Sequence, residues 1–346
     1  MAPRRVRLRL AEVARQAEVS EATVSRVLNN KPGVSESTRA TVLTAIDVLG
    51  FEVPERLRPR LGALVGLITP ELTNPIFPAF AQTIESGLAA KGFTSVLCTQ
   101  TPAGMHEDAY VQMLLDRGVA GIVFISGQHA DTGESVDRYV NLQQQGVPLV
   151  LVNGFRRGVE ANFVSSDDEA AVEHAVTHLR ELGHRRIGLA VGPKQYVPVQ
   201  AKVAAFRRVM TGVPGLSELI VTGLFTVEGG AHATATLVDR GATAIVYGSD
   251  IMALGGMRQA RRLGLSVPRD LSIIGYDDSP LMAFTDPPLT TLRQSVLEMS
   301  EAIVLALLDG THAGQEPRPH LVFQPELVVR SSTGRVPATA LREAGA

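Results

Sequence analysis

The sequence predicts an α/β protein in which a small all-α head precedes a core of two doubly wound lobes built on parallel sheets. Three observations predict this arrangement. The first sixty residues carry helical spacing and helix-capping residues. From about residue 62 onward one sequence pattern recurs: a helical segment, then a glycine, then a continuous apolar run. The recurrences fall into two sets, which a polar, glycine-containing segment separates.

The head is expected to contain three helices. Residues 10–17, LAEVARQA, place apolar side chains on one face at helical spacing. Ser20 is suited to cap a second helix over residues 21–29, and Ser35 is suited to cap a third, which Gly50 ends. The inward stripe of the second helix consists of Val24, Val27 and Leu28. That of the third consists of Ala40, Leu43, Ile46, Val48 and Leu49. Two short helices joined by a tight turn, with a third closing their core, form a helix-turn-helix module.

The core is expected to consist of repeated strand and helix units. Six glycines are suited to the position just after a helix, where glycine adopts a positive φ at the least cost. They are Gly92, Gly118, Gly146, Gly183, Gly241 and Gly264. The apolar runs that follow are continuous rather than alternating, which is typical of parallel strands buried on both faces.

These patterns divide the chain into a head, a linker, a core and a tail. We expect the helix-turn-helix head at 1–51, a short linker at 52–62, the core at 63–330 and a C-terminal tail at 331–346. The first lobe is expected at about 63–160 and 291–321, and the second at about 161–290 and 322–330. Two such lobes joined by several crossings leave a cleft between their strand ends, where doubly wound sheets bind ligands.

Charge is unevenly distributed along the chain. Residues 1–61 carry eleven Lys and Arg and seven Asp and Glu, which is a net charge of +4. The other 285 residues carry a net charge of −6. A basic head on an acidic body is typical of an anion-binding module, although a merely solvated, arginine-rich terminus has the same composition.

The single cysteine and the hydropathy pattern predict a cytoplasmic protein. Cys98 lies in the apolar run FTSVLC and is expected to be a buried thiol, since no disulfide can form within the chain. The N-terminus has no apolar segment of the kind that signal peptides carry. No apolar run approaches the roughly 20 residues that span a bilayer.

The segment VSEATVSRVLNN at residues 19–30 has the composition of a helix that reads DNA. Short hydroxyl and amide side chains reach phosphates, and arginine can bind guanine through two hydrogen bonds. The side chains expected at base edges are Glu21, Ala22 and Arg26. Those expected at phosphates are Ser20, Thr23, Ser25 and Asn29. An ordinary solvated helix has a similar composition, but the order helix, turn and helix favours DNA.

Five stretches of the chain together resemble one family. The head LAEVARQAEVSEATVSRVLNNKPGVSESTRATVLTAIDVLGF closely resembles that of lactose-repressor-type (LacI/GalR) transcriptional regulators. TPELTNPIFPAFAQTIESGLAAKGF, VSSDDEAAVEHAVTHLRELGHRRIGLAVGP, AIVYGSDIMALGGMRQARRLGLSVPRDLSIIGYDDSPLMAFTDPPLTTLRQ and ELVVRSST resemble later parts of the same family in the same order. The resemblance covers essentially the whole chain. It implies a dimeric DNA-binding protein with a core like that of periplasmic binding proteins.

The resemblance also implies which residues line an effector cleft. Carried over by position, they are Asn74, Phe77, Asn153, Lys202, Phe225, Asp250 and Asp277. Carboxylates and amides hold pairs of hydroxyl groups, and an aromatic face covers the C–H side of a sugar ring, so this set suits a sugar-like ligand. Alone, Phe77 and Phe225 are compatible with core positions and Asp277 with a turn.

The chain departs from the family at the turn and the hinge of the head. Glu18 stands where the family usually has glycine, so either Glu18 adopts a positive φ at a cost of about 1 kcal/mol or the turn differs slightly from that of the family. The linker GFEVPERLRPRLGALVGL is several residues short and lacks the Ala-Arg-x-Leu hinge helix, and Pro59 disfavours a helix there. We therefore expect a weak or absent hinge helix. Leu57 and Leu61 are the only candidates for a wedge in the minor groove.

Two further departures concern the effector and the assembly. Lys202 stands where the family usually has an arginine, and lysine donates as a point charge rather than as a planar fork. Either the group that it binds is a single hydroxyl, phosphate or carboxylate, or the pocket is atypical for the family. The tail GRVPATALREAGA has no leucine heptads, so we expect a homodimer rather than a tetramer.

Two other classes of protein were weighed against a regulator. The sequence has no glycine-rich nucleotide loop and no nucleophile elbow, so we expect no enzyme and no cofactor. His174 and His178 have the spacing of a metal pair but no third ligand, and HED at 106–108 is interpreted as a solvated helix start. A solute-binding protein would share the two lobes without the head. The expected function is therefore that of a transcriptional repressor that a small effector controls.

Overall fold

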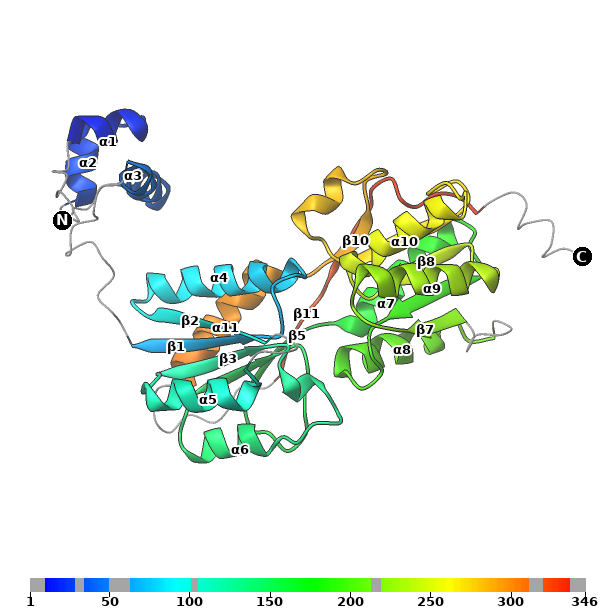
Figure 1. The fold of residues 1–346 in the computed structure, drawn as a ribbon, viewed down its shortest axis with the longest axis horizontal. Helices are drawn as coiled ribbons and strands as arrows, with labels where there is room; N and C mark the ends of the chain where they lie inside the picture. The colour runs from blue at the N-terminus through cyan, green and yellow to red at the C-terminus, as the bar shows by residue number, and fades with distance from the viewer. Residues whose placement is uncertain are drawn as a thin grey trace, which may run out of the picture. The chain divides into compact units, whose positions relative to one another are not determined.

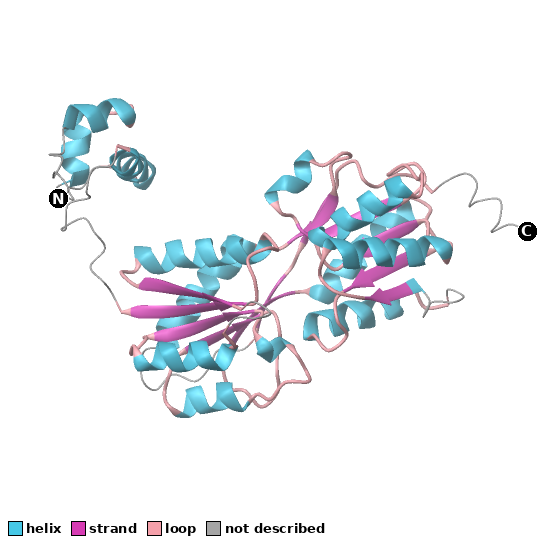
Figure 2. Cartoon of the chain, in the orientation of Figure 1, coloured by secondary structure: helices cyan, strands magenta, loops and turns pink. Residues whose placement is uncertain are grey.

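A computed structural model of the chain describes residues 10–28, 34–49, 63–100, 105–212, 219–310 and 320–336. The chain forms two compact units, residues 1–62 and 63–346. Helices make up the described part of the first unit, whereas the second contains sheets covered by helices (Figures 1 and 2). This composition confirms an α/β protein with an all-α head.

The described residues of the head form α1 (Leu10–Gln16), α2 (Glu21–Leu28) and α3 (Glu36–Val48). Between α1 and α2, Glu18 has a φ of 53°, so the turn keeps the left-handed conformation without a glycine. The Val19 N–H donates to the Ala14 carbonyl at 3.0 Å and satisfies the end of α1. Ser35 caps α3 by accepting from the Thr38 N–H at 3.1 Å.

One apolar cluster holds these three helices together. The buried side chains are Val13, Ala14, Ala17, Val24, Val27, Leu28, Val42, Ala45 and Ile46. The predicted inward stripe of α2 is thus confirmed, but that of α3 is partly wrong. Ala40 is exposed and Val48 is 66% exposed, because the face of α3 that meets the other helices runs through Val42, Ala45 and Ile46.

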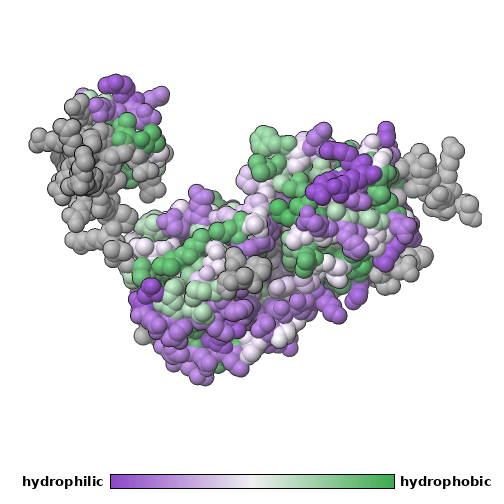
Figure 3. All heavy atoms as spheres, viewed as in Figure 1, coloured by the Kyte–Doolittle hydropathy of each residue, from purple (hydrophilic) through white to green (hydrophobic). Residues whose placement is uncertain are grey.

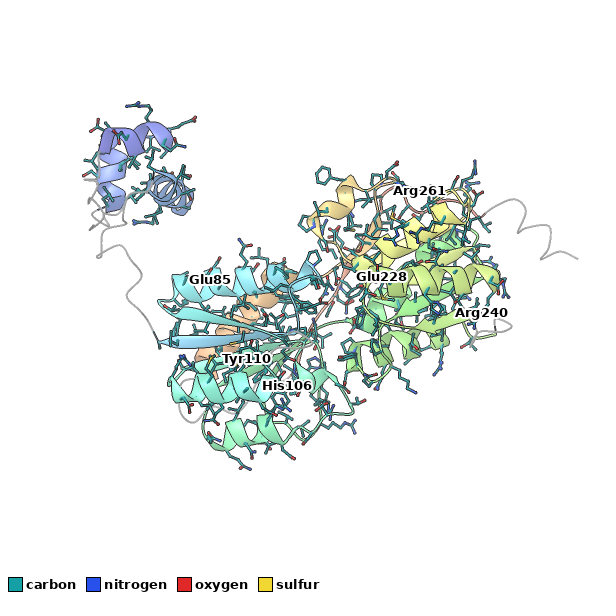
Figure 4. All side chains as sticks on the ribbon, in the orientation of Figure 1. Glu85, His106, Tyr110, Glu228, Arg240 and Arg261 are labelled. Carbon is teal, nitrogen blue, oxygen red and sulfur yellow. The ribbon has the colours of Figure 1, made fainter. Side chains whose placement is uncertain are left out.

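The first lobe contains a six-stranded sheet in the order β11-β5-β4-β3-β1-β2, in which every pair is parallel. Its strands are β1 (Leu64–Thr69), β2 (Thr94–Thr99), β3 (Gly121–Ile125), β4 (Leu149–Val152), β5 (Asn162–Ser166) and β11 (Leu321–Phe323). Its helices are α4 (Ile76–Ala90), α5 (Glu107–Asp116), η1 (Gln128–Ala130), α6 (Asp137–Gln144) and α11 (Val296–Gly310). Separate apolar clusters join α4 and α11 to one face and α5 and α6 to the other. Glu85 on α4 and His106 beside α5 accordingly lie on opposite sides of the sheet (Figure 4).

The second lobe repeats this architecture with the order β12-β10-β9-β8-β6-β7, in which only β12 is antiparallel to its neighbour. Its strands are β6 (Ile187–Val191), β7 (Ile220–Thr222), β8 (Ala244–Tyr247), β9 (Ser272–Asp277), β10 (Thr290–Arg293) and β12 (Glu326–Val328). Its helices are α7 (Asp168–Glu181), α8 (Val197–Val209), α9 (Val227–Asp239), α10 (Asp250–Arg262) and η3 (Pro280–Phe284). Clusters beneath α7 and α8 and beneath α9 and α10 cover its two faces. All six glycines expected after helices have a positive φ.

The chain crosses between the two sheets three times. It passes from β5 to α7, from β10 to α11, and from β11 to β12. Because β5 pairs with β4, the first lobe extends to Ser166 rather than to 160. Because β10 pairs with β9, the second lobe extends to Arg293 rather than to 290.

Part of the predicted tail belongs to the second lobe. The Ser332 hydroxyl donates to the Ile273 carbonyl at 2.6 Å and accepts from the Thr290 N–H at 2.8 Å. The Val336 N–H donates to the Leu182 carbonyl at 3.0 Å. The core therefore continues past 330 to at least Val336. Within the described residues, no helix has the length and apolar character needed to cross a bilayer.

Candidate functional site

The outward face of α2 presents three side chains to solvent. Glu21, Ala22 and Arg26 are exposed, while the apolar stripe on the other side of the helix is buried. At the 3.6-residue period these three positions span about 140° of the helix circumference. They are the side chains that were predicted at base edges, and they form a continuous outer surface with the half-buried Ser25 between them.

Two of the predicted phosphate contacts also fix the start of α2. The Ser20 hydroxyl accepts from the Thr23 N–H at 3.1 Å, and the two hydroxyl oxygens lie 2.9 Å apart. The predicted N-cap is thus confirmed, and it orients both hydroxyls at the positive end of the helix. Asn29 lies outside the described residues, as does the linker 52–62 with Leu57, Pro59 and Leu61.

The predicted effector residues lie mostly at the carboxyl ends of strands in both lobes. Asn74 and Phe77 follow β1, Asn153 follows β4, Phe225 follows β7, Asp250 follows β8 and Asp277 ends β9. Lys202 is the exception, because it lies within α8. In doubly wound sheets this edge is where ligands bind.

Asp277 is the centre of a buried polar group. The Gln294 amide donates to one of its carboxylate oxygens at 2.7 Å. Its Oδ2 atom is buried and has no hydrogen-bond partner among the described residues. Burial and the neighbouring Asp250 charge raise the pKa of Asp277 well above its ordinary value, against the opposing effects of Gln294, Lys202 and Asn74. Asn74 from the first lobe is therefore brought together with Asp277, Asp250 and Lys202 from the second.

A pocket of about 400 Å³ lies beside Asp277, between the two lobes. The first lobe contributes the starts of α4 and α11, and the second contributes the segments after β9 and β10. Residues of both lobes that line the pocket include Pro75, Ile76, Val296, Asp277, Ser279 and Gln294. An occupant of this pocket would contact both lobes at once.

Asp250 supports this edge of the second lobe from within. Its Oδ1 accepts from the Thr291 hydroxyl at 2.6 Å and its Oδ2 from the Ser279 N–H at 2.8 Å. Both oxygens are therefore engaged in joining β10 to the segment after β9. Burial raises the pKa of Asp250 to about 6, although these hydrogen bonds lower it.

Lys202 is neutralised inside the second lobe. Its ammonium group forms an ion pair with Asp168, the first residue of α7, and lies 3.9 Å from the centre of the Tyr276 ring. The Tyr276 hydroxyl donates to the same Asp168 oxygen at 2.8 Å. The Lys202 side chain is only 7% exposed, so its charge is already balanced without a ligand.

The other three predicted residues occupy different surroundings. Phe225 packs over Gly192, where an added Cβ would lie 2.0 Å from its ring, and its ring centre is 6.5 Å from that of Tyr196. Asn153 has a φ of 59°, and its Oδ1 accepts from the Ser166 N–H at 3.3 Å. Phe77 is half-buried against the first-lobe core.

Comparison with known proteins follows the same division into head and core. Residues 9–53 match the family model described as "Bacterial regulatory proteins, lacI family", and residues 176–333 match a periplasmic binding protein-like domain. The HTH-type transcriptional regulator MalR of Streptomyces coelicolor is 57% identical over 95% of this chain and 97% of its own length.

The chain belongs to the lacI family of bacterial regulatory proteins.

Other lacI-family proteins resemble the chain over nearly its full length. The HTH-type transcriptional repressor CytR of Escherichia coli K12 is 33% identical over 95% of this chain and 97% of its own. A complex of the transcriptional regulator CelR with cellobiose has a TM-score of 0.70 at 29% identity, covering 94% of this chain and 100% of that one. A lac repressor dimer bound to operator and the anti-inducer ONPF has a TM-score of 0.67 at 27% identity, covering 94% and 99%.

Membership of the lacI family distinguishes between the functions that were considered. The chain is a DNA-binding transcriptional regulator, and neither an enzyme nor a solute-binding protein. Its two lobes are the periplasmic-binding-protein-like core that the resemblance implied. His174 is exposed and His178 bonds Thr333 at 3.0 Å, and no cluster of potential metal ligands occurs among the described residues.

The sequence interpretation missed Glu107, Asp168, Tyr196 and Tyr276. The HED segment begins α5 as expected, but Glu107 is fully buried rather than solvated. Its carboxylate accepts from Tyr139, Gln100, Arg138 and the Gln128 N–H. These donors lie 7 to 32 residues away in the chain, so no local pattern marked the site as polar core. Asp168 could have been found as the second acid of VSSDD at a helix start.

Proposed function

We propose that this regulator is a repressor that binds a pseudo-palindromic operator as a homodimer, and that a neutral sugar held between its lobes controls operator affinity. It acts on the chromosome and therefore in the cytoplasm. The observation that carries the effector part is the buried Asp277 Oδ2 atom without a partner at a pocket that both lobes line. A sugar hydroxyl is the donor that such an oxygen accepts from.

The charges around Asp277 favour an uncharged effector. Lys202 is the cation expected to bind effector oxygens, but it is balanced by Asp168. The neighbouring Asp250 charge already raises the pKa of Asp277, so further negative charge is disfavoured at this place. Arg293, the cation among the described residues that line the pocket, is already paired with Asp278 and Glu326. A phosphate or carboxylate on the ligand would therefore have to compete for it, and burying an unpaired charge is costly. Paired hydroxyl groups instead match the carboxylate of Asp277 and the amides of Asn74 and Gln294. The CelR–cellobiose complex is a related case.

The DNA part of the proposal rests on α2. Its exposed arginine, glutamate and alanine offer a guanine-reading fork, an acceptor for cytosine and a methyl contact for thymine. Ser20, Thr23, Ser25 and Asn29 are proposed as phosphate contacts. Two copies of this helix in adjacent major grooves would read two half-sites related by the dimer axis.

The dimer part rests on apolar surface. In η3, Leu281 is 67% exposed and Phe284 is 84% exposed. Figure 3 shows apolar residues over η3 and over α4 on the same face. Large apolar side chains gathered at one surface are typical of protein interfaces. The related lac repressor structure is a dimer.

A thermal-shift series tests the effector class. We expect maltose, cellobiose or another neutral sugar to raise the melting temperature of the full chain, because a ligand that binds only the folded state stabilises it. Maltose 6′-phosphate and glucose 6-phosphate should leave it unchanged. Asp277→Asn should weaken binding of the neutral sugar about 5- to 150-fold, the effect of leaving a buried polar group without its hydrogen-bond partner. Tighter binding of the phosphorylated sugar would contradict the proposal.

A further inference from the structure

A short segment of the first lobe contacts the second lobe directly. The Thr132 N–H and the Thr132 hydroxyl both donate to the Gln195 carbonyl at 2.8 Å. The Gln200 amide donates to the Thr132 hydroxyl at 3.2 Å, and Asp131 forms an isolated antiparallel bridge with Tyr196. Residues 131–132 precede α6 of the first lobe, whereas 195–200 follow β6 of the second. The two lobes thus share a small piece of β structure outside both sheets.

This contact lies away from the three crossings of the chain. The crossings run through β5 and β11 at one edge of the first sheet and through β10 and β12 at one edge of the second. The segment 127–134 follows β3, the fourth strand from that edge of the first sheet, and 195–200 follows β6, the fifth strand from that edge of the second sheet. The lobes are therefore joined covalently on one side and by hydrogen bonds on the other.

Buried groups of the first lobe hold this segment in place. Glu107 accepts from the Gln128 N–H at 2.9 Å and also from the Tyr139 hydroxyl. That hydroxyl in turn accepts from the His129 N–H at 2.7 Å. Arg156 donates to the Asp131 carbonyl and, at 3.1 Å, to the Glu134 carbonyl. The segment is thus anchored at both ends before it reaches the second lobe.

We propose that residues 127–134 form an interlobe latch that holds the lobes closed, with Thr132 as its contact and Glu107 as its positioning residue. The inference rests on the proposed function, because it concerns the cleft in which the effector is proposed to bind. The latch sets the fraction of molecules in the closed state. An intact latch retains a bound effector longer, whereas a broken latch releases it sooner.

The latch is tested in the ligand-free full chain, so the result does not depend on which sugar binds. Spin labels are placed on exposed positions of the two lobes, Gln144→Cys on α6 and Arg207→Cys on α8, in a Cys98→Ser background. Pulsed electron-electron double resonance then gives the distribution of distances between the lobes. Thr132→Val removes the hydroxyl without changing the size of the side chain. Thr177→Val, an exposed threonine on α7, is the matched control.

We expect Thr132→Val to increase the ratio of open to closed molecules about two- to tenfold, the effect of losing one or two exposed hydrogen bonds. Thr177→Val should match the parent distribution. Glu107→Gln should broaden the distribution at unchanged helix content by circular dichroism. An unaltered distribution in Thr132→Val would overturn the latch, and an unaltered one in Glu107→Gln would overturn its anchor. Failure of every sugar to bind would instead count against the proposed function alone.

Discussion

At the scale of single residues, the same type of side chain has different roles according to burial. Arg26 is exposed on α2, where we propose that it contacts a base, whereas Arg138 and Arg156 donate hydrogen bonds within the first lobe. Asp277 keeps one unpartnered oxygen, whereas both oxygens of Asp250 are engaged. The family resemblance predicted both aspartates, but only the structure separates a carboxylate with an unpartnered oxygen from one whose oxygens are both engaged.

Replacing Arg26 with alanine tests base reading directly. We expect a loss of about 1–3 kcal/mol in discrimination between the operator and an operator altered at one base pair, because arginine binds guanine through two hydrogen bonds. Fluorescence anisotropy with a panel of altered duplexes measures it. Arg15→Ala is the control, because it removes the same charge from an exposed position on α1. An equal loss of affinity for every duplex would make Arg26 a phosphate contact.

The residues that sequence reasoning missed share one physical cause. The Tyr276 hydroxyl bonds Asp168 across 108 residues of chain, and Tyr139 bonds Glu107 across 32. Pairs of this kind depend on which strands become neighbours in the sheet, so the spacing of residues along the sequence does not predict them. The motif GYDD was informative because its chemistry lies within four residues at a strand end.

At the scale of elements, helix-capping residues and helix-ending glycines made the helices predictable. Ser20 and Ser35 cap their helices as expected, and the six helix-ending glycines adopt positive φ. The boundaries of the lobes were less accurate, because β5 and β10 are assigned by their pairing partners rather than by their own sequence. The prediction of the inward face of α3 was partly wrong because that face depends on the angle at which α3 packs against α1 and α2.

The cap of α2 should matter for operator binding as well as for stability. Ser20→Ala leaves the Thr23 N–H without its partner and should destabilise the helix by about 1 kcal/mol. Hydrogen exchange of α2 amides is expected to speed up about fivefold, with weaker binding to all duplexes. Thr44→Ala, an exposed threonine on α3, serves as the control. Unchanged exchange in α2 would show that the cap contributes nothing.

At the scale of the whole molecule, buried histidines make the stability of the core depend on pH. Burial lowers the pKa of His129 to about 3. Between that pH and about 6.5 its imidazole is therefore neutral in the folded chain but protonated in the unfolded chain. Between pH 6.5 and 3 the unfolded state binds the additional proton, and stability falls as the pH falls. The raised pKa values of Asp250 and Asp277 act in the opposite direction.

Comparison with a variant isolates the histidine. Relative to His129→Gln, the parent protein should lose about 1.4 kcal/mol of unfolding free energy for each pH unit below 6.5, because the aspartates contribute equally to both. Urea unfolding between pH 6.5 and 4.5 measures this difference. Parallel curves for the two proteins would mean that His129 is protonated in the folded state.

The central claim is that the head and the cleft are coupled, and reciprocal titration tests it most directly. The affinity of the full chain for a duplex from its own promoter region is measured with and without a neutral sugar, and the affinity for the sugar with and without that duplex. Coupling predicts that the sugar changes DNA affinity about 5- to 150-fold and that DNA changes sugar affinity by the same factor. A sugar that binds between the lobes while operator affinity stays the same would contradict the account.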